Sequence, residues 1–232
     1  MSKISAVKSI WEGFDFSYIL GIIQSLIPAL VCITLHELAH GYTAYLLGDD
    51  TAKSRGRLTL NPLKHLDVMG FLMMLVFHVG WAKPVPVNMN NFKNPKRGMA
   101  LTALAGPACN AVMAVVFMFV WGLLYIPLYA SHVGSFFLNT LQLTVHISVG
   151  LGLFNLIPIP PLDGSKVLFS LISDEKYDKL MHHGNYGVIL MLLILASGFI
   201  SRLLSAIISW TVYAISPAAQ LGMTLVYHLF YK

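Results

Sequence analysis

The feature that most restricts the fold of this chain is its first apolar run, from about Phe16 to Leu47. The run is longer than the ~20 residues that a helix needs to cross a bilayer. It therefore predicts a membrane-spanning helix. Three ionisable residues, His36, Glu37 and His40, lie inside it. Charged and ionisable groups at membrane depth are costly, so we interpret these three as candidates for a functional site.

Composition supports a membrane protein. Of the 232 residues, 56% are hydrophobic and 11% are charged, whereas soluble domains carry about 25% charged residues. We expect one integral membrane domain over residues 1–232, with a core at about 16–172 and C-terminal helices at about 186–231. The net charge of +5 fits Lys and Arg in cytoplasmic loops. Basic repeats and aromatic-basic motifs are absent from the sequence, so we expect no nucleic-acid partner.

Further apolar segments follow at about 99–129, 136–172 and 186–200, and after Arg202 to the C-terminus. We predict an all-α polytopic membrane protein with about five to six transmembrane segments. The apolar run at 67–80 is short for a span and is more typical of a re-entrant or interfacial piece. The polar loops on either side of it each hold four Lys or Arg residues, which places both loops in the cytoplasm. We therefore expect a multi-pass protein of the cell (inner or plasma) membrane.

The ionisable residues of the first run form the pattern H-E-x-x-H, "HELAH". On a helix, residues four apart share a face, so the imidazoles of His36 and His40 can reach one zinc ion. Glu37 can then activate a water molecule bound to the metal. The alternative is a polar network in which these side chains bond to neighbouring helices.

Catalytic zinc takes three protein ligands and water, so a third ligand is required. Asp163 is the main candidate, because apolar sequence continues beyond it and helix rise places it about as deep as the two histidines. The three prolines of "IPIPP" before it prevent a regular helix. Two alternatives remain: Asp163 as a helix N-cap, and His146 as the ligand, although His146 falls nearer the outer face.

Five motifs together resemble the site-2 protease family of intramembrane zinc metalloproteases: "HELAH", "GPACN", "NLIPIPPLDG", "RGRLTLNPLKHLD" and "GWAKPVPVN". The resemblance covers roughly Leu35 to Val167 and is to small bacterial members, without PDZ or CBS domains. It implies His36, His40 and Asp163 as zinc ligands and Glu37 as the catalytic residue. It also implies roles near the site for Asn110 and Asn155, as groups that hold the substrate backbone or the oxyanion. The alternative for both asparagines is interhelical hydrogen bonding.

In "AKPVPVN", Val85 and Val87 alternate with prolines that suit only an edge strand. Such a strand can accept an unwound substrate by β-addition, so we predict that Val85 and Val87 bind substrate. The alternative is a plain proline-rich loop.

The expected function is regulated intramembrane proteolysis, in which one Zn²⁺ per chain serves to cut transmembrane segments of membrane proteins. The expected partners are a transmembrane protein substrate and the lipid bilayer, with the active site toward the cytoplasmic side. The alternatives are a non-catalytic zinc-binding scaffold and a metal-ion transporter. The transporter fits less well, because it needs polar residues along a path to both membrane faces, and the polar residues here lie toward one face. The sequence leaves a homo-oligomer open.

Overall fold

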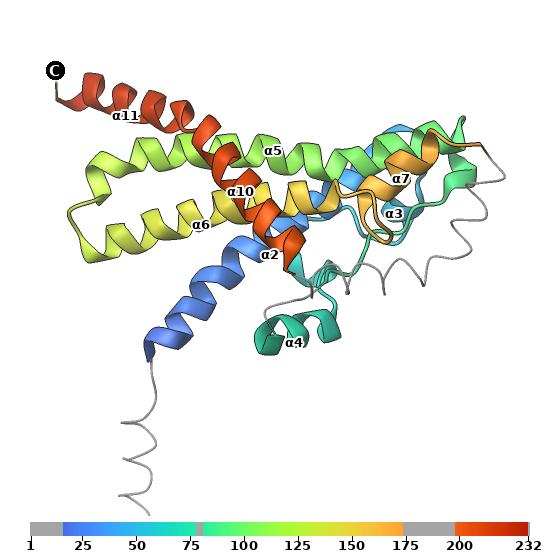
Figure 1. Ribbon diagram of the computed structural model, residues 1–232, viewed down its shortest axis with the longest axis horizontal. Helices are drawn as coiled ribbons and strands as arrows, with labels where there is room; N and C mark the ends of the chain where they lie inside the picture. Colours follow the sequence, from blue (N-terminus) through green and yellow to red (C-terminus); the bar gives the residue numbers. More distant parts are fainter. Residues whose placement is uncertain (1–15, 78–80, 174–197, 232) are drawn as a thin grey trace, which may run out of the picture.

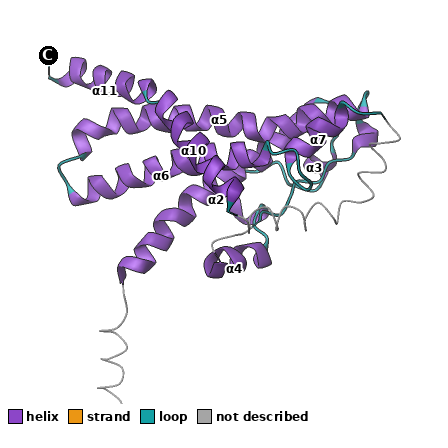
Figure 2. Ribbon diagram, viewed as in Figure 1, coloured by secondary structure: helices purple, strands orange, loops and turns teal. Residues whose placement is uncertain are grey.

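The computed structural model describes residues 16–77, 81–173 and 198–231. Over these ranges the chain is helical, and Figure 2 shows no strand in them. The one β contact in the same ranges is an isolated antiparallel bridge between Leu66 and Ala82. The longer helices are α2 (Phe16–Leu46), α4 (Val68–Phe77), α5 (Pro95–Leu128), α6 (His132–Asn155), α7 (Asp163–Ser170), α10 (Phe199–Ala214) and α11 (Pro217–Phe230). Short turns of helix are α3 (Thr51–Ser54), η1 (Pro62–Lys64) and η2 (Met89–Asn91).

Four helical stretches of the described residues are long and apolar enough to cross a membrane: 20–46, 95–128, 132–155 and 200–230. The last of these combines α10 and α11. The prediction of an all-α polytopic membrane protein is therefore confirmed. The predicted segment at 186–200 lies almost wholly outside the described residues. Helix α4 has ten residues, about half of the ~20 that a span needs, so it does not cross as a helix.

Helix α5 is the central element, since it packs against α2, α6, α7 and α11. It begins at Pro95, a few residues earlier than the apolar pattern predicted, because Asn94 caps it by accepting the Arg97 backbone N–H. A short turn then leads into α6, where Ser131 accepts the backbone N–H of Gly134. Helices α5 and α6 run side by side in opposite directions (Figure 1), which forms a frame for the other elements.

The buried core of this frame joins α5, α6 and α11. It contains Ala114, Met118, Val145, Val149 and Ala219. Helix α11 approaches α5 closely at Gly122, where an added Cβ would lie 2.1 Å from the Ala219 carbonyl oxygen. Small residues allow such contacts between helices in a membrane, where apolar burial alone does not drive association. This packing lies away from the ionisable residues of α2.

The chain breaks its helical course between α6 and α7. Helix α6 ends at Asn155, and α7 begins at Asp163. Pro158, Pro160 and Pro161 lie between them; each removes a backbone donor and prevents a continuous helix. The break that the sequence predicted is therefore present. It brings α7 back against α5, close to α2 (Figure 1).

Candidate metal centre

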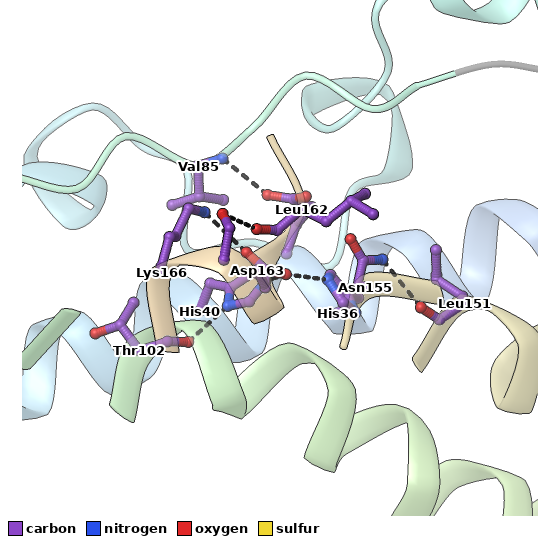
Figure 3. Close-up of polar contacts among 11 residues, drawn as sticks. His36, His40, Val85, Thr102, Leu151, Asn155, Leu162, Asp163 and Lys166 are labelled. Carbon is purple, nitrogen blue, oxygen red and sulfur yellow. Dashed lines mark hydrogen bonds and ion pairs between the residues drawn. The ribbon is translucent and has the colours of Figure 1, made fainter. Parts of the chain in front are cut away.

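Three buried side chains converge between α2 and α7 (Figure 3). His36 and His40 lie one turn apart on α2, and Asp163 is the first residue of α7. The Asp163 carboxylate oxygen Oδ2 lies 3.2 Å from His36 Nε2 and 2.9 Å from His40 Nε2. Exposure of these side chains is low, at 4% for His36, 8% for His40 and 6% for Asp163. The structure thus brings together the three residues that the sequence proposed as metal ligands.

The donor set of this cluster fits zinc. One ligand atom from each of the three residues lies within 4.8 Å of the other two, which is close enough for all three to surround one ion. Two imidazole nitrogens and a carboxylate oxygen are zinc ligands, whereas Mg²⁺ and Ca²⁺ prefer oxygen alone. Three protein ligands also leave a fourth position for water, as catalytic zinc sites require.

Neighbouring groups orient the ligands. The Nδ1 atom of His40 lies 2.7 Å from the Thr102 carbonyl oxygen, which can only accept; Nδ1 therefore carries the proton, and Nε2 keeps its lone pair for a metal. Lys166 donates to the other Asp163 oxygen, Oδ1, at 2.8 Å, which leaves Oδ2 toward the histidines. On α5, Gly106 lies directly against both imidazole rings. Sequence reasoning missed Thr102 and Gly106; the "GPACN" motif was the available signal for the glycine.

Glu37 lies beside this cluster and contacts the segment that contains the alternating prolines. We call residues 82–88 the proline segment. The backbone N–H of Val85 donates to Glu37 Oε2 at 2.8 Å. The Val85 side chain is buried, and its Cγ1 packs close to Gly41 on α2. Glu37 is thus held by a backbone group of the segment that was predicted to bind substrate.

Two anchors hold the proline segment in place. At its start, Lys83 donates its N–H to the His65 carbonyl at 2.9 Å, and its own carbonyl accepts from Arg57 at 2.8 Å. At its end, the Asn88 N–H donates to Asp49 at 2.7 Å. Burial raises the pKa of the Asp49 carboxyl, but hydrogen bonds from Thr51, Asn88 and Asn91 outweigh burial and hold this pKa below its ordinary value.

The remaining predicted residues are placed as follows. Asn110 is fully buried on α5, one turn beyond Gly106, and its side-chain amide has no hydrogen-bond partner among the described residues. Asn155 ends α6 and donates to the Leu151 carbonyl at 3.0 Å (Figure 3). Val87 is half-buried in the proline segment. His146 bonds the Gln142 carbonyl and lies outside the metal cluster, so the rival ligand is not part of this centre.

Comparison with known proteins agrees with this centre. The family model described as Peptidase family M50 matches residues 122–197, a range that includes Asp163 but not the two histidines. The "Putative zinc metalloprotease YwhC" of Bacillus subtilis is 39% identical over 175 residues, which are 73% of this chain and 78% of the relative. The "Putative zinc metalloprotease Rip2" of Mycolicibacterium smegmatis is 29% identical, over 83% of this chain and 76% of the relative. The "Putative zinc metalloprotease MJ0611" of Methanocaldococcus jannaschii is 35% identical, over 67% and 76%. No solved structure matches the chain.

The fold and the centre define a helical membrane protein with a buried His-His-Asp cluster whose donor atoms fit zinc. The chain belongs to peptidase family M50, the site-2 protease family. Zinc is its cofactor, as both the donor set and the relatives indicate.

Proposed function

We propose that this protein is an intramembrane zinc metalloprotease that cuts transmembrane segments of membrane proteins in regulated intramembrane proteolysis. One observation carries the proposal. Glu37 lies next to His36 in sequence, beside a buried His-His-Asp cluster, on a helix long and apolar enough to cross a membrane. A scaffold that only binds zinc does not need a carboxylate base beside its ligands.

The residues have separate roles in this reaction. His36, His40 and Asp163 hold the metal, which, when bound, supplies Lewis-acid activation of water and of the scissile carbonyl. Glu37 accepts a proton from the attacking water and returns it to the amine nitrogen that leaves. Thr102 keeps the His40 ring in the tautomer and orientation that metal binding requires.

Asn110 and Asn155 are proposed to hold the substrate backbone or the oxyanion that develops at the carbonyl. The support differs between the two. The Asn110 amide is buried, with no hydrogen-bond partner in the described part of the chain, so it has free donors and an acceptor. Asn155 lies on the opposite side of the helix break from Asp163 and still has an amide hydrogen and its carbonyl oxygen available beyond the bond to Leu151.

A substrate helix hides its peptide bonds, so it must unwind before it is cut. The proline segment is suited to receive the unwound chain along one edge only. The backbone groups of an extended chain alternate between its two edges, and Pro84 and Pro86 lack an N–H, so one edge loses its donors. On the other edge the Lys83 N–H is bonded to His65 and anchors the segment, whereas the Val85 N–H donates to the Glu37 side chain, so a substrate would pair from Val85 onward. A substrate strand added here would take the Val85 N–H from Glu37, which frees the carboxylate to act as a base.

The proposed location is the cell membrane, multi-pass, with the active site toward the cytoplasm. Charge supports this orientation, because the loops that flank α4 hold four Lys or Arg residues each and cytoplasmic loops are rich in such residues. The proposed partners are a transmembrane protein substrate and the surrounding lipid.

Substitution of Glu37 by Gln tests the proposal. The zinc ligands stay in place, and the Gln carbonyl can still accept the Val85 N–H, so we expect full zinc content. Loss of the base should lower cleavage of a model transmembrane substrate by ~10²–10⁴-fold. The measurement is zinc per chain and cleavage rate in detergent for both proteins. Cleavage by the variant at the wild-type rate would remove Glu37 from its role, and zinc flux into proteoliposomes would instead favour a transporter.

A further inference from the structure

A separate cavity lies beside the metal centre, on the side of α2 that carries Glu37. Its volume is about 60 Å³. Leu30, Ile33 and Thr34 of α2 line it on one element. The remaining lining comes from the chain between α3 and the start of the proline segment, and consists of Pro62, His65, Leu66, Asp67, Gly70, Phe71, Trp81 and Ala82. The lining is almost entirely apolar. No residue of the cavity belongs to the His-His-Asp cluster.

The wall on α2 is continuous with Glu37. Leu30, Ile33, Thr34 and Glu37 follow the spacing i, i+3, i+4, i+7, so they form one stripe on one helix face. Thr34 precedes Glu37 by three residues, which is ~4.5 Å along the helix axis. The cavity thus begins within one helical turn of the proposed base.

Of the other lining residues, Ala82 is the first residue of the proline segment. Ala82 lines the cavity and lies three residues before Val85, whose N–H contacts Glu37; three extended residues span ~10 Å. The bridge between Leu66 and Ala82 and the bond from Lys83 to His65 fix this part of the lining. Because Leu66 already pairs with Ala82, a substrate chain would pair at Val85, about three residues from the cavity.

Two of the lining side chains, Thr34 and His65, each contain a buried polar atom without a partner in the described part of the chain. Thr34 and His65 are 4% and 1% exposed. In the described residues, neither Thr34 Oγ1 nor His65 Nδ1 has a hydrogen-bond partner. His65 Nε2 is 2.9 Å from the Thr59 carbonyl, so Nε2 carries the proton and Nδ1 is left as an acceptor. Both atoms are covered by their neighbours, so the shape of the cavity, and not these polar atoms, selects its occupant.

We propose that this cavity is a specificity pocket, which binds one small aliphatic or hydroxyl-bearing side chain of the substrate within about three residues of the cleaved bond. The volume sets the size. Cavities that bind benzene measure about 150 Å³, so a pocket of 60 Å³ admits the side chain of valine or threonine and not an aromatic ring. This assignment rests on the proposed protease function and adds the choice of side chain to it.

The test is a set of model transmembrane substrates that carry Ala, Val, Thr or Phe at each position within three residues of the cleaved bond. At one of these positions we expect the wild-type enzyme to cut the Val and Thr substrates at least ~10-fold better than the Phe substrate, judged by kcat/KM. Phe71→Ala widens the pocket. It should raise the kcat/KM for the Phe substrate, relative to that for the Val substrate, about tenfold. Ala82→Leu narrows it and should lower the Val to Ala ratio at the same position.

Matched controls separate the pocket from general damage. Leu72 is next to Phe71 on α4 but is 49% exposed and does not line the cavity, so Leu72→Ala should leave every ratio unchanged. Thr34→Val keeps the shape of the lining, and its hydroxyl is covered, so this variant should also leave every ratio unchanged. Ratios compare substrates on one enzyme preparation, so they are insensitive to a loss of folded protein.

Two negative results have different meanings. Cleavage with no side-chain preference at any of these positions, or a preference that Phe71→Ala and Ala82→Leu both leave unaltered, would overturn the pocket while the protease function stands. Absence of cleavage by the wild-type enzyme for every substrate would overturn the proposed function and the pocket with it.

Discussion

Gly106 provides a sharp test of the candidate metal centre, because it is the point where α5 touches both histidines of the cluster. A Cβ atom at this position would lie 2.5 Å from His40 Nε2 and 2.7 Å from His36 Cε1. Carbon atoms in contact are normally separated by ~3.5–4.0 Å. Replacement of Gly106 by Ala therefore requires the rings, or α5 itself, to move by about 1 Å.

A shift of this size is large for a metal site, where ligand distances are held within ~0.2 Å. We expect Gly106→Ala to weaken zinc binding by about 10–100-fold, the effect of losing a group that orients a ligand. A misplacement of 1 Å also costs about 100-fold in rate, which corresponds to about 2.7 kcal/mol of activation free energy. The assay is zinc retention during titration with a chelator, followed by cleavage at saturating zinc.

Two other glycines provide controls for the same substitution. A Cβ at Gly122 would meet the Ala219 carbonyl oxygen at 2.1 Å, so Gly122→Ala should disturb the packing of α5 on α11 while the folded fraction keeps its zinc affinity. A Cβ at Gly21 would meet nothing within 4 Å, and Gly21→Ala should change neither property. Wild-type zinc affinity and rate in Gly106→Ala would refute the reasoning. An equal loss of zinc in Gly122→Ala would show that general packing, and not the contact with the rings, is responsible.

Three further predictions concern the ligands, the anchor and the substrate edge. Asp163→Ala should lose zinc after purification and mild chelation, whereas His146→Ala should keep it; the reverse pattern would exchange their roles. Asp49→Asn should loosen the end of the proline segment, seen as faster backbone hydrogen exchange there. The folded-state pKa of Asp49 is lowered. The stabilisation that its carboxylate provides is therefore present above the unfolded pKa of ~3.9 and is lost as the pH falls through the folded-state pKa. Protection of the proline segment against exchange that does not fall at low pH in the wild-type protein would contradict this. Cysteines at Val85 or Val87 should form crosslinks to a bound substrate; crosslinks found only elsewhere would defeat the edge model but not the protease function.

The sequence by itself determined the class of fold and the chemistry of the centre. The apolar runs are long enough to cross a bilayer, and they predict helices. In lipid, a single segment must form its own backbone hydrogen bonds, and a helix does so. The spacing of His36 and His40 places both on one face of whichever helix contains them. The three prolines before Asp163 predicted a break in the third apolar segment, since proline removes donors regardless of its surroundings. These are local properties, so they can be read without coordinates.

Only the tertiary structure decided which groups meet across the chain. His36 and Asp163 are 127 residues apart in sequence, and depth counting gave Asp163 a matching level in the membrane but no contact. The closeness of Gly106 to both rings, the bond from Val85 to Glu37 and the cavity beside Thr34 had no signal in periodicity or spacing. Each depends on how α2, α5 and the proline segment pack together, and packing is fixed by the shapes of side chains that are distant in sequence. The sequence supplies the two histidines and the aspartate, and the packing of the helices brings them together at one point.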